Sequence, residues 1–225
     1  MSKIGLIILL FVFALLSGWN SELHKGAVDA VYYSMPYEVR KELNLSYMEY
    51  GSVAPDKKFK DFTNHKYPYS YEKSKKWLEY AKTAYGKKEF NNASYSFGVA
   101  SHYILDSYSA PHYVVHENYK MHETFENSSF EFNLECKDYG LTLDYLNYKD
   151  NGGKDWADWV ETKNSNIQKE ALEKGMKMVY SQGLRAFNFN CYEKRTALED
   201  YDFIGENLTT ALVFIFVLII ILRFF

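Results

Sequence analysis

Helical spacing of apolar residues constrains the fold of this chain more than any other feature of its sequence. Apolar side chains recur at three- and four-residue steps in four segments, namely residues 24–33, 71–87, 89–108 and 167–187. No alternating pattern of strands and hairpin turns recurs, and the 225 residues include only 4 Pro and 12 Gly. We therefore expect an all-α fold, a compact single domain of several helices. Loops are expected near residues 51–69 and 150–154, where Gly, Pro, Asn and Lys cluster.

The composition argues against two broad classes of protein. Apolar residues make up 47% of the chain and aromatic residues 18%, far more than a disordered chain contains. The 26 Lys and Arg nearly balance the 29 Asp and Glu, which gives a net charge of −3. This balance argues against a strongly basic nucleic-acid-binding surface as the main feature of the protein.

The first 18 residues are typical of a secretory signal peptide. Lys3 supplies a positive charge, residues 4–16 are apolar, and Ser17 and Gly18 are small residues suited to a cleavage site. An uncleaved anchor helix is the alternative, but its apolar run is shorter than the ~20 residues that a membrane-spanning helix normally needs. We expect residues 1–18 to be removed, so that the mature chain begins at Trp19.

Residues 204–225 are predicted to anchor the chain in a membrane. The 15 residues 208–222 carry no charge and are followed by Arg223. They reach roughly 22 Å as a helix, which is short for a ~30 Å hydrocarbon core, but snorkelling of Arg223 extends the span. A removable tail exchanged for a lipid anchor is one alternative, and a buried core helix is another.

The segment between these ends, residues 19–203, is expected to be an exported domain at the extracellular face of the cell membrane. Cys136 and Cys191 can form one disulfide in an oxidising compartment or remain two buried thiols, and the sequence alone does not decide. Four N-glycosylation tripeptides are compatible with an outside location, at Asn44, Asn92, Asn127 and Asn207.

Imidazole and carboxylate side chains gather in two neighbouring segments. His102 precedes Asp106 by four residues, and His122 precedes Glu126 by the same step, so each pair projects from one face of a helix. His112 lies between the pairs, directly after the proline that we expect to end the first helix. Imidazole together with carboxylate suits zinc or another borderline divalent ion. One such pair alone is more often a surface pair or a satisfied core histidine, but two linked pairs favour a metal site.

Several other chemistries are excluded by their missing motifs. The chain has no HExxH, no Glu three residues before a His, and no CxxC. It also has neither the phosphate-binding GxxxxGK[ST] nor the GxSxG of serine hydrolases.

The run from His102 to His112, HYILDSYSAPH, resembles the HYxxD…PxH signature of zinc-dependent phospholipase C, a family that shares its helical three-zinc fold with the S1/P1 nucleases. Trp19, directly after the proposed cleavage site, corresponds to the family's N-terminal Trp. The pair Asp56 and His65 corresponds to an Asp that is followed by a loop and a His. The matches follow the order of the family along most of the exported domain.

The resemblance implies three zinc ions, whose ligands are imidazoles, carboxylates and the N-terminal residue: Trp19, His24 and Asp106 for the first, Asp56, His65, His102 and Asp106 for the second, and His112, His122 and Glu126 for the third. Asp106 would bridge two ions, and Asp56 would be the catalytic residue that orients or deprotonates the attacking water. Asp61 is an alternative to Asp56, which we prefer, and His116 is left without a role.

Three further positions correspond to the family's substrate-binding pocket for choline. Glu22 and Phe62 resemble the family's Glu and Phe, whereas Lys57 stands where a Tyr is expected. A Lys there disfavours a quaternary ammonium head group. The spacing from Trp19 to His24 looks like that of the nuclease branch, whereas Glu126 looks like the phospholipase branch.

The resemblance therefore implies a monomeric, zinc-dependent hydrolase that cleaves a phospholipid or another phosphodiester with an activated water. The membrane would be a partner through the C-terminal helix. One alternative is a three-zinc nuclease of the S1/P1 type, which would act on nucleic acid. The other is a non-catalytic surface module that binds zinc for structure.

Overall fold

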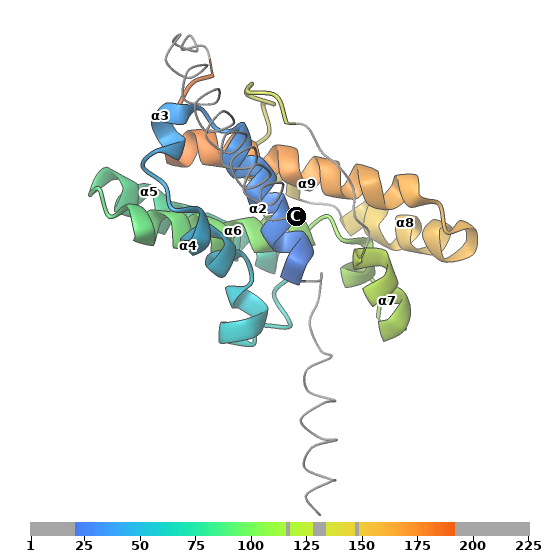
Figure 1. Cartoon of the computed structure of the whole chain (residues 1–225). Coiled ribbons are helices and arrows are strands. Elements are labelled where there is room, and N and C mark those ends of the chain that lie inside the picture. The colour runs from blue at the N-terminus through green and yellow to red at the C-terminus, as the bar shows by residue number, and fades with distance from the viewer. Residues whose placement is uncertain (1–20, 116–117, 128–133, 147–148, 192–225) are drawn as a thin grey trace, which may run out of the picture. The chain divides into compact units, whose positions relative to one another are not determined.

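The computed structural model describes residues 21–115, 118–127, 134–146 and 149–191 (Figure 1). The predicted signal peptide, Trp19, His116 and the predicted anchor over residues 204–225 lie outside these residues. The described chain up to Asn190 belongs to one compact unit, and the fold below is that of this unit.

The described residues form helices and no strand, which confirms the all-α prediction. The α-helices are α2 (Ser21–Ser34), α3 (Tyr37–Arg40), α4 (Leu45–Ser52), α5 (Tyr69–Gly86), α6 (Phe90–Asp106), α7 (Tyr119–Glu126), α8 (Lys149–Thr162) and α9 (Ser165–Ala186). Three short elements join them, the π-helix η1 (Pro55–Phe59) and the 3-10 helices η2 (Ala110–Tyr113) and η3 (Leu143–Leu146). None of the described helices is both long and apolar enough to cross a membrane.

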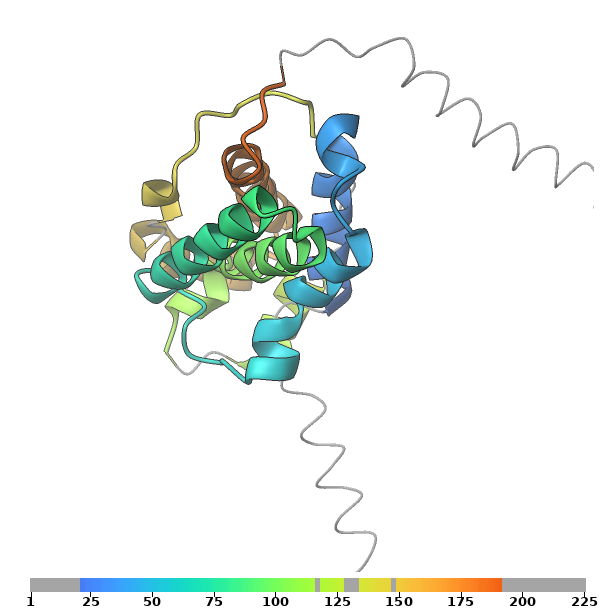
Figure 2. The same cartoon turned by 90° about the vertical axis from the view of Figure 1, so that its left-hand side faces the viewer.

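Helix α6 is the centre of the unit. Figures 1 and 2 show it surrounded by α2, α4, α5 and α9, each of which packs against it. Its sequence explains this position, because small and apolar residues occupy every face and almost all of its side chains from Ala93 onward are buried. Side chains on α6 therefore meet groups from several other helices.

Two glycines allow α4 and α6 to pack backbone against backbone. A Cβ atom on Gly51 would lie 2.1 Å from the carbonyl oxygen of Tyr95, and one on Gly98 would lie 2.1 Å from that of Met48. Neither space can hold a methyl group, so glycine is required at both positions. The close approach brings the carbonyl oxygen of Ser52, at the end of α4, within 2.8 Å of His102 on α6.

The prediction of a loop near residues 150–154 is wrong, because these residues lie within α8. Gly152 serves packing rather than a turn, since a Cβ atom there would meet the ring of Tyr113 at 2.6 Å. Trp156 and Trp159 of the same helix form a small core with Phe125. Burial of these three rings offsets the weak helix propensity of the glycines and holds α7 against α8.

The expected loop over residues 51–69 is only partly a loop. It begins with the last turn of α4 and contains the π-helix η1. The helix that we expected to end at Pro111 ends earlier, at Asp106. The backbone N–H groups of Tyr108 and Ser109 bond three residues back to Leu105 and Asp106, which closes the last turn. Pro111 instead lies in the first turn of η2.

Cys136 and Cys191 are both disulfide-bonded, so the two buried thiols that the sequence left possible are not present. 

Candidate metal centre

The last turn of α6 supplies the centre of the candidate site. His102 and Asp106 are fully buried, and His102 Nε2 lies 3.1 Å from Asp106 Oδ2. The other ring nitrogen of His102, Nδ1, lies 2.8 Å from the backbone oxygen of Ser52 and donates to it. This bond fixes the ring orientation and directs Nε2 towards the carboxylates, which is how metal-binding histidines are usually held.

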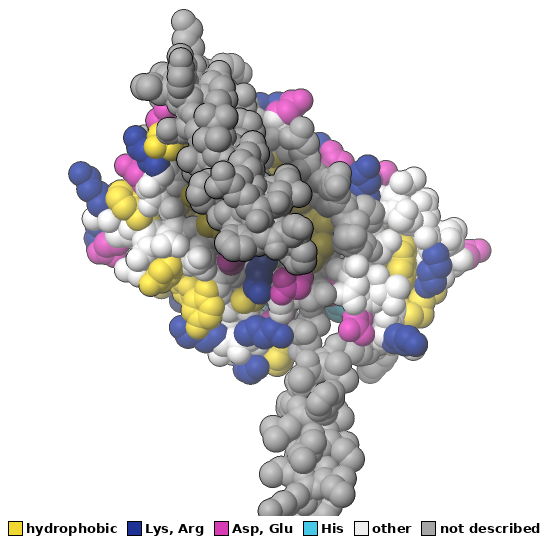
Figure 3. Space-filling model, viewed as in Figure 1, with side chains coloured by type: hydrophobic (Ala, Val, Ile, Leu, Met, Phe, Trp, Pro, Cys, Tyr) yellow, Lys and Arg dark blue, Asp and Glu magenta, His cyan; other side chains and the backbone are white. Residues whose placement is uncertain are grey.

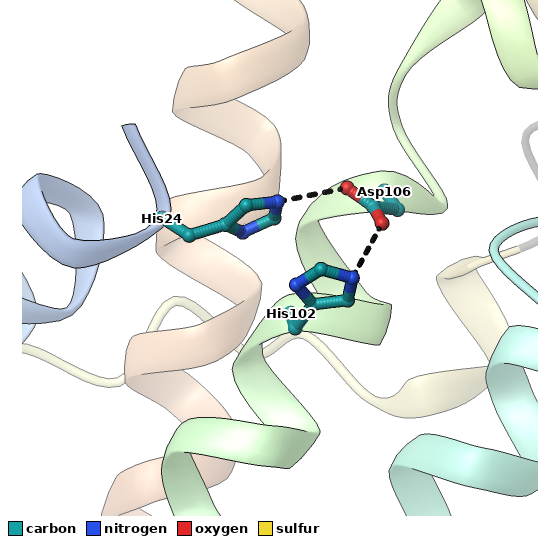
Figure 4. Close-up of side chains that lie close together, drawn as sticks. All are labelled: His24, His102 and Asp106. Carbon is teal, nitrogen blue, oxygen red and sulfur yellow. Dashed lines mark ion pairs between the residues drawn. The ribbon is translucent and has the colours of Figure 1, made fainter. Parts of the chain in front are cut away.

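Helix α2 adds His24, which lies beside both Asp106 and His102. His24 Nε2 lies 3.3 Å from Asp106 Oδ1, and Figure 4 shows the Asp106 carboxylate paired with both His24 and His102. The two rings stack, with centroids 4.1 Å apart and an interplanar angle of 22°. The two oxygens of Asp106 therefore face different histidines.

The segment after α4 adds Asp56 and His65. Asp56, in η1, is buried, and its Oδ1 lies 3.5 Å from His65 Nε2 and 3.7 Å from His102 Nε2. His65 Nδ1 lies 2.6 Å from Asp106 Oδ2. Asp56 of η1 and Asp106 of α6 therefore both lie beside the imidazoles of His65 and His102.

Asp61, the alternative to Asp56, has a different environment. Its carboxylate accepts hydrogen bonds from Lys73 Nζ at 2.9 Å, the Tyr103 hydroxyl at 2.9 Å and Asn64 Nδ2 at 2.6 Å. Burial opposes ionisation of this carboxylate, but these donors outweigh it and lower the pKa of Asp61 to about 2. Its backbone oxygen is in close contact with His65 Nε2. Asp61 therefore supports the loop that carries His65, and the geometry favours Asp56 beside the imidazoles.

A third set of side chains comes from η2 and α7. His122 Nε2 lies 2.9 Å from Glu126 Oε1, and His112 Nε2 lies 3.4 Å from the same oxygen. The Ser109 hydroxyl donates to this oxygen at 2.8 Å. His112 Nε2 is also 4.0 Å from Asp106 Oδ1, so this group continues into the rest of the site.

Four sets of three side chains offer donor atoms within 4.8 Å of one another: His24, His102 and Asp106; Asp56, His65 and His102; His65, Asp106 and His112; and His112, His122 and Glu126. The structure thus brings together every predicted ligand that lies among the described residues. The resemblance did not anticipate that His102 also faces the His24 set or that His112 approaches Asp106. Both contacts depend on where α2 and η2 lie relative to the end of α6, which residue spacing does not indicate.

The arrangement fits a bound divalent cation. Oδ1 of Asp56 and Nε2 of His112 are buried and form no hydrogen bond with any described residue. Buried polar atoms of this kind are costly unless a partner satisfies them, and here they point at other nitrogen and oxygen donors. Imidazole nitrogens with carboxylate oxygens are a donor set that zinc prefers.

The pKa values of the metal-free site reflect these close contacts. Burial disfavours the protonated ring of His65, but the charges of Asp106 and Asp56 outweigh it and raise the pKa of His65 to about 9. Burial also opposes the charge of Asp106, yet His102, His24 and His65 hold its pKa well below the usual value. The metal-free site is therefore an ion-paired cluster in which His65 carries a proton near neutral pH.

The third group behaves differently. Burial raises the pKa of Glu126 to about 7, although His122 opposes the shift. Burial likewise lowers the pKa of His112 well below its usual value, with His122 adding to the effect. A neutral imidazole is the form that binds a metal ion, so His112 is prepared for ligation without losing a proton.

Zinc binding is expected to release protons from this site. The raised pKa of His65 means that its ion pair with Asp106 stabilises the metal-free protein fully below pH 6.5, and this contribution is lost as the pH rises through about 9. Zinc binds only the deprotonated ring, so binding near pH 7 must expel that proton. Calorimetric titration with zinc in two buffers of different ionisation enthalpy should show release of about one proton or more. Equal heats in both buffers would contradict this, and His65→Gln should release fewer protons than the wild type.

The three predicted substrate-binding side chains are all exposed at the surface. Glu22 lies in the first turn of α2, 3.1 Å from Lys25, and Lys57 belongs to η1. Phe62 follows η1 with 53% of its surface exposed.

Comparison with known proteins adds one match. The family model described as zinc dependent phospholipase C matches residues 23–190, a span that includes every described residue of the metal site. No curated protein and no solved structure matches the chain.

Proposed function

Because the chain belongs to the zinc-dependent phospholipase C family, we propose that it hydrolyses the phosphodiester bond of phospholipids with an activated water. The observation that carries this proposal is the buried cluster of imidazoles and carboxylates around Asp106, in which four sets of donor atoms share neighbours. Shared neighbours allow several metal ions to lie close together, an arrangement that suits phosphodiester hydrolysis.

We propose three zinc ions held by the ligands that the resemblance implies. His24 and Asp106 would hold the first together with Trp19, whose position is outside the described residues. The second set has its donors on η1, the following loop and α6, and the third on η2 and α7. When bound, zinc supplies Lewis-acid polarisation of the phosphoryl oxygens and makes a bound water more acidic.

The chain's own residues suit distinct roles. The two oxygens of Asp106 face different histidines, Oδ1 towards His24 and Oδ2 towards His65 and His102, so this carboxylate can bridge two cations. Asp56 Oδ1 lacks a hydrogen bond and lies beside both imidazoles of its set, which suits it to orient a water molecule and accept its proton. The Ser109 hydroxyl holds Glu126 towards His112 and His122.

A phospholipid is favoured over nucleic acid as the substrate. The family match favours it, as does Glu126, which resembles the phospholipase branch. The proposed export signal and C-terminal anchor would place the site beside lipid outside the cell. The exposed Lys57 disfavours choline lipids, because its charge repels a quaternary ammonium group.

The zinc-loaded protein should release phosphorylated head groups from phospholipid vesicles, and removal of zinc by a chelator should abolish this release. Single-stranded DNA and RNA are assayed in parallel with the same preparation. Rapid cleavage of nucleic acid alone would reject the phospholipase proposal in favour of a nuclease. Tight zinc binding without hydrolysis of either substrate would instead support a non-catalytic module.

A further inference from the structure

The segment that joins Asp56 to His65 has buried ends and an exposed middle. Asp56 and His65 are each 5% exposed, whereas Lys58 and Lys60 are exposed to solvent and Phe59 is 37% exposed. The metal site is therefore connected directly to a short surface segment that combines positive charges with an aromatic ring.

Neighbouring helices extend this surface with further aromatic rings. Phe59 stacks on Trp77 of α5, with centroids 5.6 Å apart and an interplanar angle of 10°. Lys58 Nζ lies 5.9 Å from the ring centre of Tyr50 and 5.5 Å from that of Tyr95. Tyr50, on α4, is 54% exposed. In the lower part of Figure 3, the surface of α4 and η1 shows basic side chains next to hydrophobic ones.

The exposed segment between Asp56 and Asp61 is basic. The sequence from residue 57 to residue 60 is KKFK, with three lysines and no carboxylate, although the whole chain carries a net charge of −3. Of the two flanking acidic residues, Asp56 is buried among the imidazoles and Asp61 is bonded to Lys73. Neither carboxylate is free to neutralise the lysines, so this segment attracts an anionic surface.

We propose that Tyr50, Lys58, Phe59 and Lys60 form a patch that binds the surface of anionic phospholipid membranes and brings the metal site to its substrate. Aromatic rings with a polar edge favour the membrane–water interface, and lysines beside them are attracted to acidic head groups. The proposal rests on the proposed function only in taking phospholipid as the substrate.

Single-stranded nucleic acid, also anionic, fits this patch less well. Binding of nucleic acid by aromatic residues requires free ring faces on which bases stack. One face of Phe59 is covered by Trp77, and Lys58 lies over the rings of Tyr50 and Tyr95. The exposed parts of the rings therefore suit shallow contact with head groups better than base stacking.

The test compares two full-length double variants that change the net charge equally. K58E/K60D reverses two charges in the patch, with Asp chosen at position 60 because that residue has a left-handed backbone. K169E/K174E reverses two exposed charges on α9, which Figures 1 and 2 show away from η1. Binding is measured by flotation with vesicles of phosphatidylcholine alone and with added phosphatidylserine. Residues 204–225 are the same in every variant, so differences between variants report on the patch.

K58E/K60D should bind phosphatidylserine vesicles about 30-fold or more weakly, while K169E/K174E should bind like the wild type. The loss should shrink at high salt and with vesicles of phosphatidylcholine alone. Equal binding by the two variants would overturn the proposal. So would a loss by K58E/K60D that appears with oligothymidylate but not with vesicles.

Two further measurements separate failure of the patch from failure of the proposed function. Hydrolysis of a short-chain phospholipid that stays monomeric in water should be unchanged in K58E/K60D, because neither lysine is part of the metal site. Wild-type protein that binds vesicles through the patch but hydrolyses no phospholipid would refute only the proposed function. Tyr50→Ser changes no charge and should also weaken vesicle binding several-fold; normal binding by this variant, with an unchanged melting temperature, would contradict the role of the rings.

Discussion

Asp106→Asn should reduce both zinc content and hydrolysis more than any other substitution in the site. Asn keeps the size of the side chain but removes the negative charge that faces His24, His65 and His102. Loss of a residue that merely orients a metal ligand typically costs 10- to 100-fold in affinity or activity. Loss of a carboxylate that bridges two cations should cost more, so we expect activity to fall by more than about 100-fold. Metal analysis of the purified protein should show fewer bound ions.

Asp29→Asn is the matched control for this substitution. Asp29 lies on α2 beside Glu49, and burial together with that neighbour raises the pKa of Asp29 to about 6. Its replacement by Asn removes a carboxylate from the same fold without touching the imidazoles, so zinc content and activity should stay at the wild-type level. Unchanged zinc content and activity in Asp106→Asn, measured beside this control, would refute the bridging role. Circular dichroism of both variants shows whether the helices remain folded.

The sequence allowed prediction of those parts of the site that a single helix determines. His102 with Asp106, and His122 with Glu126, are separated by four residues, and the geometry of a helix alone makes each pair neighbours. The long central helix was also predictable, because its residues are small or apolar on every face. Its end was not, because hydrogen bonds of the last turn close it before the proline.

Contacts between elements could not be predicted from spacing. His24 and His102 stack because α2 packs on α6, a contact between residues 78 positions apart in the sequence. The choice between Asp56 and Asp61 was likewise open, since both are carboxylates in one short segment. It depends on Lys73 and Tyr103, which come from two other helices and bond Asp61.

The glycines of α8 led to the incorrect prediction of a loop, again because a contact between elements could not be seen in the sequence. Glycine indicates a turn when only the local sequence is considered, but a glycine can also mark a place where another group approaches the backbone closely. Gly152 is of the second kind, because the ring of Tyr113 occupies the space of its missing side chain. The local sequence contains no sign of that ring, which lies 39 positions earlier.

Gly98→Ala should destabilise the protein strongly and weaken zinc binding at the same time. The added methyl group would lie 2.1 Å from the carbonyl oxygen of Met48 and 2.9 Å from the backbone nitrogen of Ser52. Backbone atoms cannot move aside as a flexible side chain can, so α4 must shift away from α6. We expect a loss of about 3 kcal/mol or more in the free energy of unfolding, the upper end for an overpacked core. Thermal and denaturant unfolding measure this loss.

The coupling to zinc follows from the same shift, because the carbonyl oxygen of Ser52 would move away from Nδ1 of His102 and that ring would lose its orientation. Gly26→Ala is the matched control: a Cβ atom on Gly26 of α2 meets nothing within 4 Å, and Ala favours a helix over Gly by about 1 kcal/mol. Gly26→Ala should therefore be neutral or slightly stabilising, with normal zinc affinity. If Gly98→Ala lowered stability but left zinc affinity per folded molecule unchanged, the bond from Ser52 would not be what orients His102. If it lowered neither, α4 and α6 would not pack through their backbones.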